Sequence, residues 1–154
     1  MAYINVSGPN SNAILQIATA TIASTTTGYI VPALQDITVN NAAGIFSWQQ
    51  LDEFSIKNVP TPASNSIAAN MVVDKSIFFD ATVGSSGVPG LFNLQNDAQK
   101  IYFRVYFDGR VSGSKYVSGE GFITNLAPTV NPQAPVWVSP ITVSVDGDLT
   151  PGTV

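Results

Sequence analysis

The sequence contains neither cysteine nor histidine among its 154 residues, and only 10% of its residues are charged. Without cysteine the chain can form no disulfide, no thiolate nucleophile and no sulfur-ligated zinc site. Without histidine it lacks the commonest general base and the commonest transition-metal ligand. Most familiar enzyme mechanisms are thereby excluded, so we expect a protein that is not an enzyme, with no catalytic residue, no metal site and no cofactor.

Charge is both scarce and unevenly placed. Ten acidic residues oppose six basic ones, and every basic residue lies between Lys57 and Lys115. Tight nucleic-acid binding needs several clustered cations to displace counterions from phosphates, which this balance does not suit. A low charge with many neutral polar residues is typical of a surface that meets other protein, and a net acidic surface would repel DNA.

Long apolar runs are also missing. No stretch approaches the roughly 20 apolar residues of a membrane span. The first residues show no basic region followed by an apolar core, as an export signal would. We therefore expect no membrane insertion, and we expect the chain to stay in the compartment where it is made.

The second half of the sequence alternates apolar and polar residues, as half-buried strands do. Residues 101–107 are the clearest case, and Asp108 and Gly109 follow them as a turn signal. Two further strands are expected at 115–124, where two glycines suggest a bulge or a close backbone approach, and at 141–145.

The first half alternates less regularly. Its β-branched and apolar runs predict four more strands, at residues 13–24, 29–40, 45–56 and 71–81. Polar and turn-forming residues predict a turn at 40–44 and a loop at 60–66. Proline in the first turn and leucines spaced by three predict one short helix at 89–96.

These elements predict an all-β fold, a β-sandwich or barrel with one short flanking helix. A chain of this length forms one domain's core, so we expect a single domain over residues 1–154. The polar, glycine- and proline-containing ends predict flexible arms at about 1–12 and 150–154.

Two short patterns admit a chemical interpretation, but each has a simpler one. Ser112 and Lys115 have the S-x-x-K spacing of serine acyl-transfer enzymes, which place the pair one helical turn apart. The glycine between them favours a turn that joins two strands. Asp146 and Asp148 could offer oxygens to calcium, which takes about six to eight ligands. Nothing nearby supplies the rest, so a turn is again favoured.

Two other pairs are candidates for ligand contacts. Asp52 and Glu53 could supply half of a glycosidase carboxylate pair, but neighbouring residues of a strand point to opposite faces. Phe46 and Trp48 would share one strand face, where they could stack on a sugar. Large aromatics on a strand are more often part of the core, and we expect them there.

The order of the elements in the second half carries a family resemblance. A short helix at 89–94, a strand at 101–107 and a turn at 108–109 precede a strand at 116–124, and residues 141–150 close the series. This series resembles the C-terminal half of the major tail tube proteins of long-tailed bacteriophages. The first half is compatible, because the strand expected before residue 57 is similar to the family's strand that precedes a long loop.

The resemblance implies a β-sandwich or barrel with one flanking helix. It implies six subunits that close into a ring, and rings that stack into a tube that conducts the genome into the host. The implied partners are the chain itself and other tail proteins, such as the tape measure, tail terminator and distal tail proteins. DNA would meet the chain only in transit. The implied location is the tail of the virion, after assembly in the host cytoplasm.

Candidate site residues follow from the resemblance. Acidic residues on strands are candidates to face the lumen: Asp52, Glu53 and Glu120. Residues 57–70 would form the long inter-strand loop, and its candidates for ring-to-ring contacts are Lys57, Pro60, Pro62 and Asn65.

Two alternative functions stay open. One is a β-sandwich module that binds carbohydrate or a host surface through Phe46, Trp48, Trp137 or the tyrosines. The other is a tail terminator or neck ring protein, which forms one ring and does not polymerise. Concentration-dependent polymerisation distinguishes the tube subunit from both.

Overall fold

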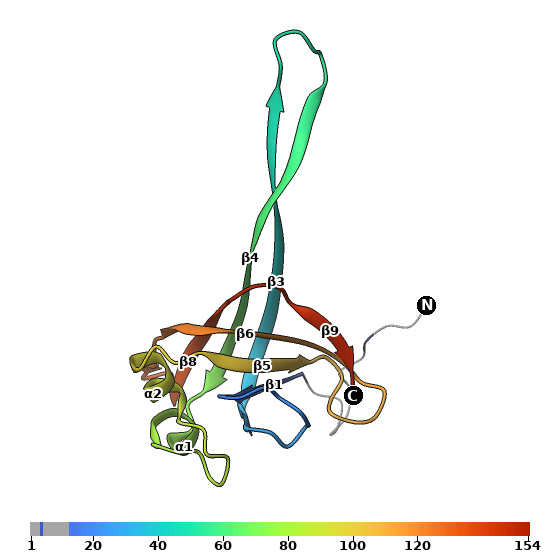
Figure 1. Ribbon diagram of the computed structural model, residues 1–154. Coiled ribbons are helices and arrows are strands. Elements are labelled where there is room, and N and C mark those ends of the chain that lie inside the picture. Colours follow the sequence, from blue (N-terminus) through green and yellow to red (C-terminus); the bar gives the residue numbers. More distant parts are fainter. Residues whose placement is uncertain (1–3, 5–12) are drawn as a thin grey trace.

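Antiparallel β-strands make up most of the structure (Figure 1). This computed structural model describes Ile4 and residues 13–154. In chain order the elements are β1 (Ile14–Ala18), β2 (Tyr29–Ile30), β3 (Leu34–Gln49), β4 (Ile56–Val72), α1 (Lys75–Phe79), α2 (Leu91–Asn96), β5 (Ile101–Tyr106), β6 (Lys115–Leu126), β7 (Thr129–Asn131), β8 (Ala134–Val145) and β9 (Thr150–Thr153). The all-β class expected from the sequence is confirmed.

Within the described residues the strands join one sheet in the order β2-β1-β5-β6-β8-β4-β3, with β7 added to β8 and β9 to β6. Strand β6 links the two halves of this sheet, because Gly121 pairs with Ile101 of β5 on one side and with Val145 of β8 on the other. A Cβ at Gly121 would collide with the carbonyl oxygen of Ser144. The close backbone approach expected here is therefore confirmed.

Both halves of the sheet and both helices pack on one apolar core. The alternation of β5 is confirmed, since Ile101, Phe103 and Val105 are almost fully buried. The residues that the rest of the fold contributes to this core include Leu15, Ile17, Ile67, Met71, Phe78, Leu91, Leu94, Ile123, Ile141 and Val143.

The structure has two short helices where the sequence predicts one. Helix α2 lies within the predicted range 89–96. Helix α1 corrects the strand expected at 71–81. The Asp74 side chain caps this helix by accepting hydrogen bonds from the backbone N–H groups of Ser76 and Ile77, which ends the extended backbone of β4. A run of five residues is too short for its apolar pattern to distinguish a helix from a strand.

The turn expected at 40–44 and the loop expected at 60–66 are both wrong, because these residues lie inside β3 and β4. The two strands pair along almost their whole length and form a long hairpin, and the turn that joins them covers residues 50–55. A register shift near Ala42 and Gly44 gives β4 one extra residue there. A β-bulge and exposed edge positions accommodate prolines and polar residues that otherwise signal a loop.

The ends of the chain differ from the expectation in one respect. Residues 150–154, expected as a flexible arm, include strand β9, which pairs with Lys115–Ser118 of β6. Gly147, with a φ of +91°, allows the chain to turn between β8 and β9. Apart from Ile4, the arm expected at residues 1–12 lies outside the described residues.

Candidate self-assembly surface

The hairpin of β3 and β4 projects from the rest of the molecule (Figure 1). Strand β4 pairs with β8 only from Ser66 to Val72, so residues before Ser66 have only β3 beside them. We call residues 42–65 the arm and the other described residues the body. At about 3.3 Å per residue, the arm extends roughly 25–30 Å from the body. Isolated two-stranded ribbons are marginally stable in water, so an arm of this length is expected to pack against a partner.

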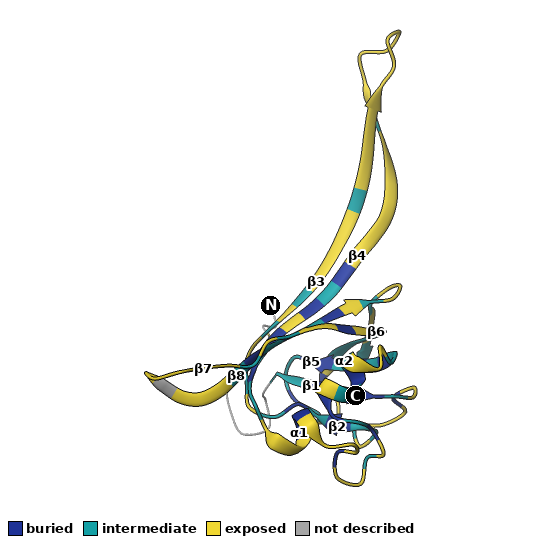
Figure 2. Cartoon of the chain, turned by 90° about the vertical axis from the view of Figure 1, so that its left-hand side faces the viewer, coloured by how far each residue is buried: buried dark blue, intermediate teal, exposed yellow. Residues whose placement is uncertain are grey.

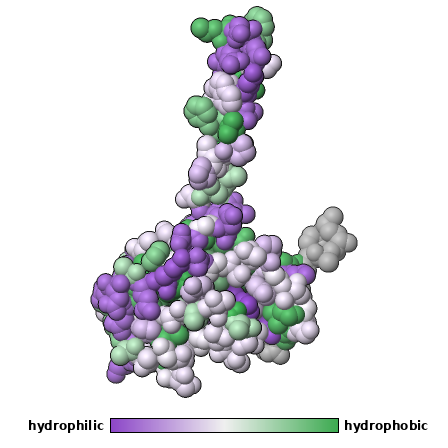
Figure 3. Space-filling view, viewed as in Figure 1, coloured by the Kyte–Doolittle hydropathy of each residue, from purple (hydrophilic) through white to green (hydrophobic). Residues whose placement is uncertain are grey.

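Most residues of the arm are exposed to solvent (Figure 2), and several of them carry large apolar side chains. Leu51 and Phe54, in the turn at its tip, are completely exposed. Figure 3 shows apolar side chains at the tip and along the arm, between polar ones. The complete set of exposed large apolar residues on the arm is Ile45, Phe46, Trp48, Leu51, Phe54, Ile56 and Val59. Several large apolar side chains exposed on one element indicate a site of protein interaction.

Phe46 and Trp48 do not lie in the core, as the sequence led us to expect. They are 59% and 36% exposed, and their rings stack with centroids 6.0 Å apart. Phe46 lies opposite Val59, and Trp48 lies opposite Lys57. Because directly opposed residues of two strands share a face, these side chains form one aromatic face of the arm. The shared face expected for Phe46 and Trp48 is present, but it is exposed to solvent and not packed in the core.

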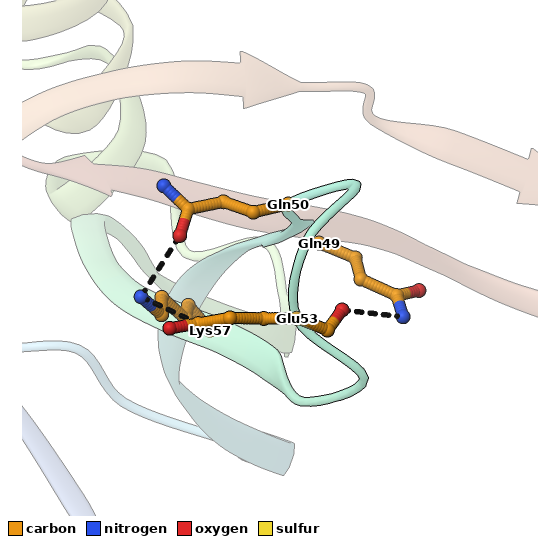
Figure 4. A network of polar contacts seen from close by, with 4 residues as sticks. All are labelled: Gln49, Gln50, Glu53 and Lys57. Carbon is orange, nitrogen blue, oxygen red and sulfur yellow. Dashed lines mark hydrogen bonds and ion pairs between the residues drawn. The ribbon is translucent and has the colours of Figure 1, made fainter.

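A polar network holds the turn at the tip (Figure 4). The Lys57 ammonium lies 2.8 Å from the Glu53 carboxylate and donates to the Gln50 side chain at 3.1 Å. The Gln49 amide donates to the backbone oxygen of Glu53 at 3.2 Å. An ion pair this exposed contributes about 1 kcal/mol or less. The network therefore fixes the conformation of the turn but contributes little to the stability of the arm.

The three lumen candidates lie in two places. Asp52 and Glu53, expected on a strand, lie in the turn at the tip of the arm. Glu120 lies on β6 in the body, where Lys100 bridges it at 2.7 Å to Asp146 at 2.9 Å. Hydrogen bonds from Lys100 to Glu120 first, and then to Asp146, raise the pKa of Lys100 above its ordinary range. Whether any of the three acids faces a lumen stays a prediction.

The four candidates for ring-to-ring contacts also lie in two places. Lys57, Pro60 and Pro62 lie on the arm, within a strand and not in the loop that the sequence predicted. Asn65 lies at the base of the arm and is only 5% exposed. Its side chain accepts a hydrogen bond from the backbone of Ala42 and donates one to the backbone of Gly147. Asn65 thus attaches the arm to the body, and a role in ring contacts stays a prediction for all four.

A second apolar surface lies on the body, and sequence reasoning missed it. A pocket of about 240 Å³ is lined by Val73, Phe79, Pro128 and Trp137. Phe79 and Trp137 are each more than half exposed. Val73 lies between β4 and α1, Phe79 ends α1, Pro128 precedes β7 and Trp137 lies in β8. Their bulky apolar side chains were the available signal, but only the fold brings them together.

The residues considered for acyl transfer and for calcium binding lie in turns or make contacts within the fold. Ser112 lies in the loop between β5 and β6, and the Lys115 ammonium donates to the Thr153 hydroxyl at 2.6 Å. Asp146 pairs with Lys100. Among the residues that the structure describes, no group of three or more acidic side chains is placed to hold a metal ion. In the same part of the chain, neither helix has the length and apolar character needed to cross a membrane.

Comparison with known proteins identifies the fold. No family model matches the chain, and no curated protein matches it in sequence. The structure is similar to the SPP1 tail tube (TM-score 0.66, 13% identity, covering 97% of this chain and 80% of that one). It is also similar to a chain of the tail of a gene transfer agent particle described with C6 symmetry (0.62, 12%, 90% and 93%). A third similar structure is the tube terminating cap of the anti-feeding prophage (0.59, 14%, 99% and 97%). The chain therefore has the fold of phage tail tube proteins, and the resemblance found in its sequence is confirmed at the level of the fold.

Proposed function

We propose that this chain is a structural protein of a virion, the subunit of a tail tube that forms stacked homohexameric rings. The observation that carries the proposal is the apolar arm on a tail tube fold. Its exposed aromatic face, with Phe46 and Trp48, needs a partner. A second copy of the same chain would provide that partner in a self-assembling tube. The protein is then not an enzyme, and its activity is assembly.

Sheet edges support ring closure. Strand β3 ends the sheet on one side and β2 ends it on the other. Unpaired edges promote aggregation in a monomer, but a closed ring that joins each edge to the next subunit removes them. The C6 symmetry described for the similar gene transfer agent tail supports six subunits in such a ring.

The distribution of charge supports a channel that conducts DNA without binding it. The net charge is −4, and several cations are already engaged within the chain. Lys100 contacts two carboxylates, and Lys57 contacts a third. Arg104 lies 4.4 Å from the centre of the Tyr116 ring. Few cations are then left to hold phosphates, and Asp52, Glu53 and Glu120 are the candidates to face the lumen.

The remaining parts of the proposal follow from this role. The first partner is the chain itself, and the others are tail proteins that meet the ends or the lumen of the tube, such as the tape measure, tail terminator and distal tail proteins. DNA is present only in transit. The protein is located in the tail of the virion and assembles in the cytoplasm of the host.

The test is electron microscopy of the purified protein over a concentration series, with light scattering for mass. We expect rings of sixfold symmetry at low concentration and hollow tubes at high concentration. Val59→Asp, on the arm, is expected to prevent assembly, because it places a charge on the apolar face. Val111→Asp is the matched control, since Val111 is similarly exposed but lies in a loop of the body. A protein that stays monomeric at every concentration would contradict the proposal.

Two observations favour other functions enough to be tested beside it. The exposed stack of Phe46 and Trp48 suits a sugar ring, so saturable quenching of Trp fluorescence by a glycan, lost in Trp48→Ala, would indicate a binding module. Similarity to a tube terminating cap favours a terminator. Single rings that never stack, even at the highest concentration, would indicate that function.

A further inference from the structure

The tip of the arm and the apolar pocket lie at opposite ends of one strand. Phe54 lies two residues before the start of β4 at Ile56, and Val73 of the pocket follows its last residue, Val72. Figure 1 shows the tip at the end of the molecule opposite to α1. A strand of 17 residues separates the two features by roughly 55 Å at about 3.3 Å per residue.

The two features match in size and chemistry. Phe54 is 101% exposed and Leu51 is 110% exposed, so the tip presents an aromatic ring and an aliphatic side chain without a partner. The pocket is open to solvent, has a volume of about 240 Å³ and has apolar walls from Val73, Phe79 and Trp137. A closed apolar cavity of about 150 Å³ takes up benzene, so this pocket has room for a phenyl ring. Burial would remove both apolar surfaces from water.

A second copy of this chain can supply the occupant of the pocket. The tip cannot reach the pocket of its own molecule, because the paired strands β3 and β4 hold the two apart. A contact between different patches of two copies is heterologous, and when it does not close it repeats without limit. The two patches lie at opposite ends of β4. Each repeated tip-to-pocket contact therefore adds one more copy in the direction in which the arm extends.

The size of the contact also fits this arrangement. An aromatic side chain buries about 150–250 Å², well below the roughly 800 Å² per partner of a stable complex. One tip in one pocket is therefore too weak to hold two free monomers together. Six such contacts between two rings act together, so that their combined affinity greatly exceeds that of one.

We propose that Phe54 and Leu51 of one subunit insert into the Val73, Phe79, Pro128 and Trp137 pocket of a subunit in the next ring. This inference rests on the proposed tube function and names the two surfaces that hold its rings together. Loss of the contact is expected to leave rings intact and to weaken their stacking.

The first test uses Phe54→Ala and Trp137→Ala. Both side chains are more than half exposed in the subunit, so each variant is expected to keep the thermal unfolding midpoint of the wild type. Each is expected to form rings but to need at least a tenfold higher concentration for tubes. Val111→Ala, which removes a side chain 53% exposed on the body, is the control and is expected to form tubes as the wild type does. Unchanged tube formation by Phe54→Ala would overturn the inference.

The second test uses the absence of cysteine, which leaves no background thiols. Ser55→Cys lies beside Phe54, and Thr129→Cys lies beside Pro128 of the pocket. When the two variants are mixed and oxidised, we expect covalent heterodimers, because the proposed contact brings the two cysteines together. A disulfide requires Cα atoms about 4.4–6.8 Å apart, so the cross-link reports that the tip lies against the pocket. A chain that carries both substitutions is expected to form a ladder of covalent oligomers. Ser112→Cys, exposed on the body, is the control partner and is expected to give no cross-link with Ser55→Cys.

The outcomes separate the inference from the proposed function. If the wild type forms tubes but the Ser55 and Thr129 variants do not cross-link, the tube function stands and this contact is wrong. If the wild type forms neither rings nor tubes, the tube function is wrong. Cross-linking at high protein concentration then still decides whether tip and pocket bind each other.

Discussion

The side chain of Asn65 donates a hydrogen bond to the backbone oxygen of Gly147 at 3.2 Å, across 82 residues of sequence. The same side chain accepts from the backbone of Ala42. One buried amide thus joins β4 to β3 and to the turn between β8 and β9, at the point where the arm leaves the body. Asn65 thus attaches the arm to the body, in addition to the pairing of β4 with β8.

Asn65→Ala is therefore expected to destabilise the subunit. It removes both hydrogen bonds, and a typical hydrogen bond of this kind contributes about 0.5–1.5 kcal/mol. Urea unfolding measures the change. Asn58→Ala, on the same strand but exposed, is the control, and its effect is expected to stay within about 0.5 kcal/mol. Equal effects of the two substitutions would show that Asn65 does not hold the arm.

Tyr106→Phe is expected to weaken the pairing of β1 with β5. The Tyr106 hydroxyl donates to the side-chain oxygen of Gln16 at 2.6 Å, and both residues are at most 1% exposed. Removing the hydroxyl leaves a buried amide oxygen without its donor, which costs about 1–3 kcal/mol. Tyr102→Phe, on the same strand but partly exposed, is the control. A free energy of unfolding equal to that of the wild type would count against this bond.

Gly121→Ala is expected to disrupt the junction between the two halves of the sheet. A Cβ at this position would collide with the backbone oxygen of Ser144, and a backbone atom inside a sheet cannot move away without breaking strand pairs. We expect a loss of stability of more than about 2 kcal/mol, typical of overpacking. Thr124→Ala, exposed on the same strand, should have little effect. Normal stability of the glycine variant in thermal unfolding would contradict the prediction.

Asp74 is expected to make the stability of α1 depend on pH. Hydrogen bonds from the backbone of Ile77 and from Ser76 lower the pKa of this carboxyl. Because the folded pKa is depressed, its stabilisation is present above the unfolded pKa of about 3.9 and is lost as the pH falls through the folded value. Asp74→Ala should cost about 1 kcal/mol at neutral pH. Asp74→Asn keeps a capping group that does not titrate, so it should retain stability while flattening the pH profile below pH 4. An unchanged profile in Asp74→Asn would assign the dependence to other carboxyls.

Several elements could be predicted because their evidence is local. Strand β5 alternates strictly, and its inner residues Ile101 and Phe103 are buried as that pattern requires. Helix α2 follows a proline and carries leucines on one side, and Leu91 and Leu94 are buried. In these segments the residue pattern reflects contact with the protein's own core.

The arm could not be predicted for the opposite reason. Pro60 and Pro62 are typical of a loop, yet they lie in β4, because a strand with an unpaired edge has positions that need no N–H donor. Phe46 and Trp48 have the alternation of a core strand, yet they lie in solvent. Periodicity shows that a strand has an apolar face, but not whether the face meets the same chain or another copy.

The sequence by itself determined the all-β class and the absence of thiol and imidazole chemistry, because composition and short-range alternation are sufficient for these properties. Only the tertiary structure decided where the apolar surface lies. The pocket of Val73, Phe79, Pro128 and Trp137 forms because strand pairing brings β4, α1 and the β7–β8 segment together. The tip of the arm is exposed because β4 extends beyond the last residue that β8 can pair with. Both features depend on contacts between distant segments, which local residue patterns do not record.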